Sequence, residues 1–127
     1  MWKKELPKSC PPTHAIEKEV ELYRVLSSDT PTEADFKSYC DLYPDNPRFK
    51  NLCKAYALSF YDTLDNALLA LTRSTTLKGT HIGTYQLNKT HGVCEFKEGH
   101  GHYSIWLYDN WDFNEFNPTT ISPINGN

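Results

Sequence analysis

The sequence predicts an α+β domain with a mainly antiparallel sheet and about three helices. Segments typical of helices gather in the first part of the 127-residue chain, and three consecutive segments typical of strands follow them. This order does not alternate in the manner of βαβ units, which argues against a doubly wound parallel sheet. Aromatic residues make up 13% of the chain, so a compact core can form without many aliphatic side chains.

The first regular element is expected at Val20 to Leu26, a stretch of strand-forming residues that ends at Ser27-Ser28-Asp29. Two helices are expected next. Thr30-Pro31-Thr32-Glu33 predicts a helix start, with Thr30 as the cap and proline at the first helical position. Asn46-Pro47 predicts the start of a second, short helix after a turn.

Residues 57 to 61 are expected to form a strand that leads into a third helix. Asp62 or Thr63 can cap this helix, which carries apolar residues at helical spacing. Three further strands are expected at residues 81–87, 93–97 and 102–108, separated by glycine-containing turns. Residues 1–116 would then form a single domain, and residues 117–127, rich in Pro, Asn, Thr and Ser, a flexible C-terminal tail.

Charge and hydropathy exclude several classes of partner. The formal net charge is −3 and no basic stripe is present, so nucleic acid is not an expected partner. The longest apolar run, Ala67 to Leu71, is far shorter than the ~20 residues that a spanning helix needs, so no membrane association is expected. No apolar stretch follows Lys3-Lys4, and a cytoplasmic location is therefore expected. The four cysteines show no C-x-x-C spacing and are expected to be reduced thiols.

One polar cluster raises the possibility of a metal site. His91, Cys94, His100 and His102 include the residue types that zinc prefers. Their spacing is not that of a recognised zinc module, and alternate side chains on a strand point to opposite faces. Histidines in glycine-flanked turns are more often solvated, so the sequence predicts no metal site.

Two residues on predicted strands are candidates for ligand contacts. Arg24 lies between Tyr23 and Val25, and a guanidinium among apolar strand residues needs a carboxylate or an anionic ligand if it is buried. Alternatively, Arg24 lies on the solvent face of an edge strand. Ser59, flanked by Leu58 and Phe60, faces either solvent or a cleft.

Three stretches resemble the core of an ADP-ribosyltransferase-like domain: Leu22-Tyr23-Arg24-Val25, then Ala57-Leu58-Ser59-Phe60-Tyr61, then Ile82-Gly83-Thr84-Tyr85-Gln86-Leu87. The whole chain is also similar to a group of small uncharacterised bacterial proteins, common in cyanobacteria. That group shares the Tyr-Arg opening, the Leu-Ser-Phe-Tyr stretch and an ending like Gly101 to Trp106. This second resemblance implies no activity.

The transferase resemblance implies a cleft that binds NAD or a related nucleotide. The catalytic candidates are Arg24, Ser59 and His102. The transferase resemblance implies that Arg24 contacts the phosphate or ribose side and Ser59 the ribose–nicotinamide region, whereas His102 and Trp106 match only the small bacterial group. The residues implied in cofactor binding are Tyr23, Arg24, Ser59, Tyr61 and Trp106. The sequence departs from the transferases because it has no Glu-x-Glu or Gln-x-Glu on a late strand, and Glu95 is the nearest substitute. Such a carboxylate stabilises the positive charge that develops as nicotinamide leaves, so its absence argues against transferase activity and leaves nucleotide binding, with or without catalysis, as the expectation.

A second hypothesis is a non-enzymatic interaction module, such as an immunity, adaptor or defence-accessory protein. The acidic and aromatic segment from Asp109 to Phe116 would contribute Trp111, Phe113 and Phe116 as anchors in a protein partner. The alternative is that this segment folds back on its own domain. Whether the protein is an enzyme, and its oligomeric state, stay open at this level.

Overall fold

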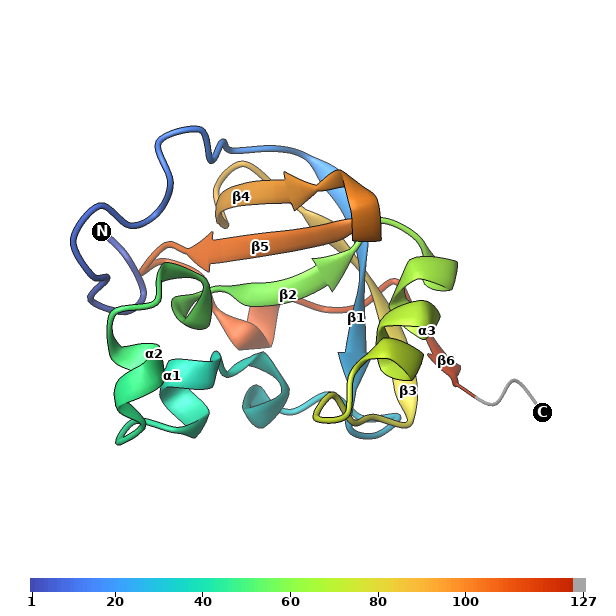
Figure 1. Cartoon of the computed structure of the whole chain (residues 1–127). Helices are drawn as coiled ribbons and strands as arrows, with labels where there is room; N and C mark the ends of the chain where they lie inside the picture. The colour runs from blue at the N-terminus through green and yellow to red at the C-terminus, as the bar shows by residue number, and fades with distance from the viewer. Residues whose placement is uncertain (125–127) are drawn as a thin grey trace.

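A computed structural model, which describes residues 1–124, contains one six-stranded sheet in the order β4-β5-β2-β1-β3-β6, with every neighbouring pair antiparallel (Figure 1). This confirms the predicted α+β class. The strands are β1 (Val20–Leu26), β2 (Leu58–Tyr61), β3 (His81–Leu87), β4 (Gly92–Lys97), β5 (His102–Leu107) and β6 (Thr120–Pro123). The α-helices are α1 (Tyr39–Leu42), α2 (Pro47–Lys50) and α3 (Leu64–Arg73). The 3-10 turns are η1 (Glu33–Phe36), η2 (Cys53–Tyr56), η3 (Glu98–His100) and η4 (Phe113–Glu115).

The sheet consists of two halves that meet at a single residue pair. β4, β5 and β2 form one half, and β1, β3 and β6 form the other. Between β1 and β2 the only described register pair joins Tyr23 to Tyr61, whereas β1 and β3 pair along their whole length. In Figure 1, β1 accordingly crosses β2 steeply instead of running beside it. Backbone groups of β2 beyond this pair therefore need partners other than β1.

The two faces of the sheet carry separate cores. Leu22 and Leu26 of β1 lie on the face that buries the larger cluster, with Phe36 and Trp111 packed against it. The opposite face holds a smaller cluster in which Ala67 and other residues of α3 cover the sheet. α3 begins at the predicted cap Thr63, whose hydroxyl accepts a hydrogen bond from the Asn66 amide at 3.1 Å. Within residues 1–124, no helix is long and apolar enough to cross a membrane.

The first predicted helix is replaced by two shorter elements, η1 and α1. The cap of η1 is Thr32, not Thr30, and the Asp35 carboxylate accepts a hydrogen bond from the Thr32 amide at 2.9 Å. A second capping box follows at once, because Ser38 caps α1 and Asp41 accepts from the Ser38 amide at 3.1 Å. Two closely spaced cap signals therefore divide the segment that the sequence pattern assigns to one helix.

The predicted flexible tail is wrong for part of its length. Thr120–Pro123, within the stretch 117–127 assigned to the tail, forms β6 and pairs with β3 from His81 to Thr84. The Thr120 hydroxyl donates to the Thr84 hydroxyl at 2.9 Å, and Ile121 packs against the larger core. Residues 125–127 of the predicted tail lie outside the described residues.

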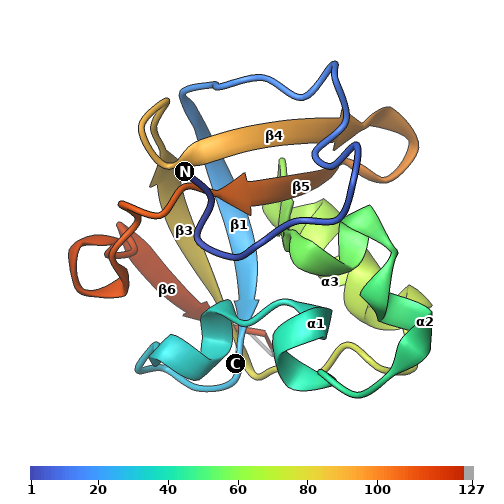
Figure 2. The same cartoon turned by 90° about the vertical axis from the view of Figure 1, so that its left-hand side faces the viewer.

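The N-terminal segment, residues 1–16, lies against β4 and β5 (Figure 2). The Lys3 amide donates to the Leu107 carbonyl at 3.0 Å, and Ile16 forms a bridge with Cys94. A disulfide joins Cys10 of this segment to Cys53 of η2, with 5.5 Å between the Cα atoms. The expectation of four reduced thiols is thus wrong for Cys10 and Cys53; the spacing of the two residues, 43 apart, gave no sign that the fold brings them together.

Candidate functional site

Arg24 occupies the place where β1 and β2 diverge. Its guanidinium donates twice to the Asp35 carbonyl, at 3.0 and 2.6 Å, and once to the Ser59 carbonyl at 2.6 Å. The group lies between the rings of Phe36 and Phe60, 5.2 and 5.3 Å from their centroids. Arg24 thereby gives hydrogen-bond partners to one carbonyl of β2, that of Ser59, and to one of η1, that of Asp35.

The charge of Arg24 has no direct counter-ion among residues 1–124. The described ion pairs involve other residues, and the Asp35 carboxylate is taken up by hydrogen bonds from Ser27 and Thr32. Burial lowers the pKa of Arg24 to about 10, which leaves it charged at neutral pH. The three hydrogen bonds account for three of the five guanidinium N–H groups, so two donors are left for another acceptor.

Ser59 and His102 form a hydrogen-bonded pair on the α3 face of the sheet. Tyr61 pairs with His102 and Ser59 with Ser104 across β2 and β5, so Ser59 and His102 are diagonal neighbours on one face. The Ser59 Oγ and His102 Nε2 atoms are 2.9 Å apart. Burial lowers the pKa of His102 to about 4, and the charges of Lys54 and Lys97 act in the same direction. The imidazole is therefore neutral at neutral pH, and in the tautomer protonated at Nδ1 its Nε2 accepts a hydrogen bond from the Ser59 hydroxyl.

A cavity of about 200 Å³ opens beside these residues, and we call it the inner cavity. Arg24, Ser59 and Tyr61 line it from the sheet, α1 contributes Tyr39 and Leu42, and Ser74 and Leu77 follow α3. Burial raises the pKa of Tyr61, and its hydroxyl has no hydrogen-bond partner within the described residues. Three of the predicted site residues are thus brought to one cavity, while His102 stands behind Ser59 and is not part of the lining.

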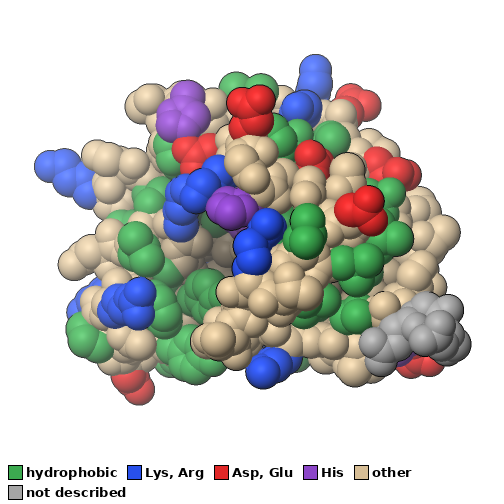
Figure 3. Space-filling view, turned by 45° about the vertical axis from the view of Figure 1, so that its right-hand side comes forward, with side chains coloured by type: hydrophobic (Ala, Val, Ile, Leu, Met, Phe, Trp, Pro, Cys, Tyr) green, Lys and Arg blue, Asp and Glu red, His purple; other side chains and the backbone are tan. Residues whose placement is uncertain are grey.

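A wider hollow of about 670 Å³ adjoins the inner cavity, and Tyr39, Leu42 and Leu77 line both. Three aromatic rings form part of its wall: the Tyr39 and Phe49 rings stack with centroids 5.5 Å apart, and Tyr43 is 54% exposed. Figure 3 shows hydrophobic side chains gathered at the lower left, over α1 and α2, next to Lys and Arg side chains. We call the inner cavity and this outer hollow together the groove.

The charges of the groove are all positive among residues 1–124. Arg24 and Lys37 line the inner cavity, and Arg48 and Lys78 line the outer hollow, whereas no Asp or Glu lines either. Lys37, Arg48 and Lys78 are exposed and form no ion pair with a described carboxylate. On a protein with a formal charge of −3 this local excess favours an anionic ligand.

Two predicted cofactor-binding residues lie away from the groove. Trp106 is 0% exposed and its indole N–H donates to the Cys53 carbonyl at 3.1 Å, so its ring is a core element beneath η2. Tyr23 packs against the smaller core and is not part of the groove lining. Both residues were expected near a cleft because of the resemblances to other proteins, and the turns that cover them were not predictable from those resemblances.

The histidines and cysteine considered for zinc do not converge. Cys94 faces the larger core, while His102 lies on the opposite face beside Ser59, because β4 and β5 alternate as strands do. His91 packs against Phe116, and His100 is exposed in η3. Within residues 1–124 no group of three or more potential ligands is close enough to hold a metal ion.

Sequence reasoning missed the residues that give the groove its character. The sequence pattern singled out none of the groove residues Lys37, Tyr39, Arg48 and Lys78. Their common signal is exposure of aromatic and basic side chains on short, capped turns. That signal becomes informative only when the fold brings α1, α2 and the segment after α3 together.

The C-terminal aromatics proposed as interaction anchors pack on their own domain. Trp111 and Phe116 are each 6% exposed and belong to the larger core, and Phe113 packs against it. The Phe116 ring stacks on Tyr85 with centroids 4.8 Å apart. These contacts leave little of the three side chains for a partner.

Comparison with known proteins gives no relative whose binding site could be set beside this groove. No protein-family model, no curated protein and no solved structure matches the chain.

Proposed function

We propose that this protein is a nucleotide-binding domain that holds NAD or a related nucleotide in the groove, as an ADP-ribosyltransferase-like domain without transferase chemistry. The observation that carries the proposal is the lining of the groove, where four cationic side chains and exposed aromatic rings occur without a carboxylate. Phosphates and bases together are the ligand groups that such a lining complements.

The sizes of the two parts favour a bipartite ligand. The inner cavity, at about 200 Å³, is smaller than the ~300–1,000 Å³ of most small-molecule sites, whereas the outer hollow of about 670 Å³ falls within that range. We place the adenine base on the exposed rings of Tyr39 and Tyr43. The phosphates would then lie near Arg48 and Lys78, and the smaller end of the ligand would enter the inner cavity beside Arg24.

The chemistry available beside the inner cavity supports binding more than transfer. The Ser59 hydroxyl, with the neutral His102 behind it, can donate to and accept from a ribose, but ADP-ribosyl transfer also needs a carboxylate opposite the developing positive charge. Glu95 does not line the groove: its carboxylate contacts His14 and lies 3.5 Å from the Lys54 amine. We therefore expect no release of nicotinamide on incubation with NAD.

Isothermal titration calorimetry with NAD and ADP-ribose tests the proposal. Arg24→Ala is unsuitable because Arg24 also holds the fold together, so we choose the exposed pair Arg48→Gln and Lys78→Gln. We expect saturable binding to the wild type and about tenfold weaker binding to the double variant, since each exposed charge contributes up to about 1 kcal/mol.

Lys50→Gln is the matched control, because Lys50 is an exposed cation on the same helix α2 and does not line the groove. Its affinity should equal that of the wild type. Absence of binding to the wild type, or an equal loss in Lys50→Gln, would count against the proposed site.

The interaction module is less well supported as a function. Its proposed anchors Trp111 and Phe116 are used in the larger core, and partner binding through them would require that core to open. A protein partner that docks on the exposed rings of α1 would instead compete with the nucleotide.

A further inference from the structure

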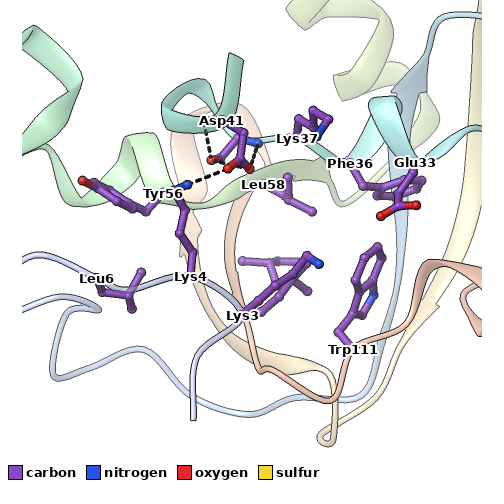
Figure 4. A pocket seen from close by; sticks show the side chains of 13 residues that line it. Lys3, Lys4, Leu6, Glu33, Phe36, Lys37, Asp41, Tyr56, Leu58 and Trp111 are labelled. Atoms are coloured by element: carbon purple, nitrogen blue, oxygen red, sulfur yellow. Dashed lines mark hydrogen bonds and ion pairs between the residues drawn. The ribbon is translucent and has the colours of Figure 1, made fainter. Parts of the chain in front are cut away.

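A second cavity lies beneath the N-terminal segment, and we call it the N-terminal cavity (Figure 4). Its volume is about 200 Å³. Lys37, Ser38 and Leu58 line both this cavity and the inner cavity of the groove, so the two sites lie on either side of Lys37. Residues 3, 4 and 6 of the N-terminal segment form one wall.

The floor of the N-terminal cavity is the edge of the larger core. Leu58 of β2, Ile105 and Leu107 of β5, Phe36 of η1 and Trp111 contribute apolar surface to it. Trp111 is also a donor without a described acceptor, since its buried indole N–H makes no hydrogen bond within residues 1–124. The floor is therefore apolar apart from this indole N–H, and it can accept an apolar body.

The rim supplies charge. The Lys4 amine and the Asp41 carboxylate are 2.7 Å apart and neutralise each other, as the dashed line in Figure 4 marks. Of the other charged residues, Lys3 places its amine 5.1 Å from the centroid of the Trp111 ring. Neither Lys3 nor Lys37 nor Glu33 forms an ion pair with a described residue. Once the Lys4–Asp41 pair is set aside, two cations and one anion are left, an excess of one positive charge.

We infer that the N-terminal cavity binds a small monocarboxylate with an apolar body, such as an aryl- or alkyl-substituted acid. One carboxylate neutralises the excess charge of the rim, and Lys3 and Lys37 can approach it from the N-terminal segment and from the turn before α1. The apolar body then packs against the side of the cavity that Leu58 and Leu107 line. A polyphosphate would leave a surplus of negative charge next to Glu33 and Asp41, and it fits the groove better.

The test is a calorimetric titration of the full chain with 3-phenylpropionate, with 3-phenyl-1-propanol as the neutral counterpart of the same shape. Saturable binding of the acid, at least tenfold tighter than that of the alcohol, is the expected result. Equal affinities would overturn the proposal because the charged rim would then contribute nothing, and no binding of the acid would overturn it too.

Two variants should shift the affinity in opposite directions. Lys3→Gln removes a cation of this cavity that does not line the groove, and should weaken binding of the acid about fivefold. Glu33→Gln removes a negative charge that repels the carboxylate of the acid, and should tighten binding of the acid. Both side chains are exposed, and the Lys3 amide keeps its hydrogen bond to Leu107, so both variants should fold.

Lys8→Gln is the control, because Lys8 is an exposed cation of the same segment and does not line the cavity. An unchanged affinity in Lys3→Gln, or the same loss in Lys8→Gln, would overturn the assignment. Since Lys3 and Glu33 are not part of the groove, NAD binding should be the same in both variants. Failure of this proposal is thereby distinguishable from failure of the proposed function.

Discussion

Arg24 has two roles at once: it links β1 to β2 and η1, and it presents charge to the inner cavity. Its removal leaves the carbonyls of Asp35 and Ser59 without their donors. Because each unsatisfied buried polar group costs about 1–3 kcal/mol, we expect Arg24→Ala to lower the free energy of unfolding by roughly 2–4 kcal/mol. Urea denaturation measures this loss.

Arg73→Ala is the control for Arg24→Ala, since Arg73 is exposed in the last turn of α3. Its change should stay within about 0.5 kcal/mol. If Arg24→Ala were as mild as this control, Arg24 would not be the link between the two halves of the sheet.

His102 makes stability depend on pH. Burial lowers its pKa from the ordinary 6.5 to about 4, so between these values the unfolded chain binds a proton that the folded chain does not. Stability is then fully present above about pH 6.5 and is lost as the pH falls towards 4. We expect His102→Asn to reduce this slope, as measured by thermal unfolding across the range.

His100→Asn serves as the comparison, because His100 is exposed and lies two residues away. Other acid-sensitive groups, including His91, whose pKa is also lowered by burial, are present in both variants. A difference between the two slopes therefore reports on His102. The same slope in His102→Asn and the wild type would mean that the His102 imidazole is not shielded in the folded protein.

At the scale of elements, the strands β1 to β5 were predictable, whereas β6 and the division of the first helix were not. Val20–Leu26 and His81–Leu87 have the bounds that their strand-forming residues predict. The helix expected from Thr30 divides at Ser38, because the Asp35 and Asp41 carboxylates each close a separate capping box. β6 was missed since its polar sequence resembles a loop, and only pairing with β3 makes it a strand.

The Cys10–Cys53 disulfide links the N-terminal segment covalently to η2. It closes a loop of 43 residues, so its loss should lower the free energy of unfolding by about 2–4 kcal/mol. Cys10→Ser with Cys53→Ser, compared with the wild type by urea denaturation, measures the effect. Thiol titration of the unreduced, denatured wild type should find two free thiols, those of Cys40 and Cys94; four would contradict the pairing.

Disulfides form chiefly in oxidising compartments, and this bears on location. The expectation of reduced cysteines followed from the predicted cytoplasmic location, and the Cys10–Cys53 bond contradicts that expectation. The location itself stays a prediction.

At the scale of the whole molecule, the candidate site could be predicted only in part. Arg24, Ser59 and Tyr61 could be proposed from their strands, and all three line the inner cavity. The cations Arg48 and Lys78 come from segments 30 residues apart, and no periodicity in the sequence joins them. Their convergence depends on how α1, α2 and the segment after α3 pack, which is a property of the tertiary structure alone.

The overall charge of −3 and the cationic groove also set how binding depends on salt. The cations of the groove attract anions although the protein as a whole is negative. At 0.1 M salt this attraction is screened beyond about 10 Å from an exposed cation. Nucleotide affinity should therefore weaken as the ionic strength rises.

A titration of ¹⁵N-labelled protein with NAD, followed by amide NMR, tests the central claim most directly. If NAD binds in the groove, the amide signals of residues around it, 39–43, 59–61 and 74–78, should shift saturably. Amides of β6, which lies at the far edge of the sheet, should stay in place. A spectrum unchanged at millimolar NAD, or shifts confined to residues outside the groove, would contradict the account.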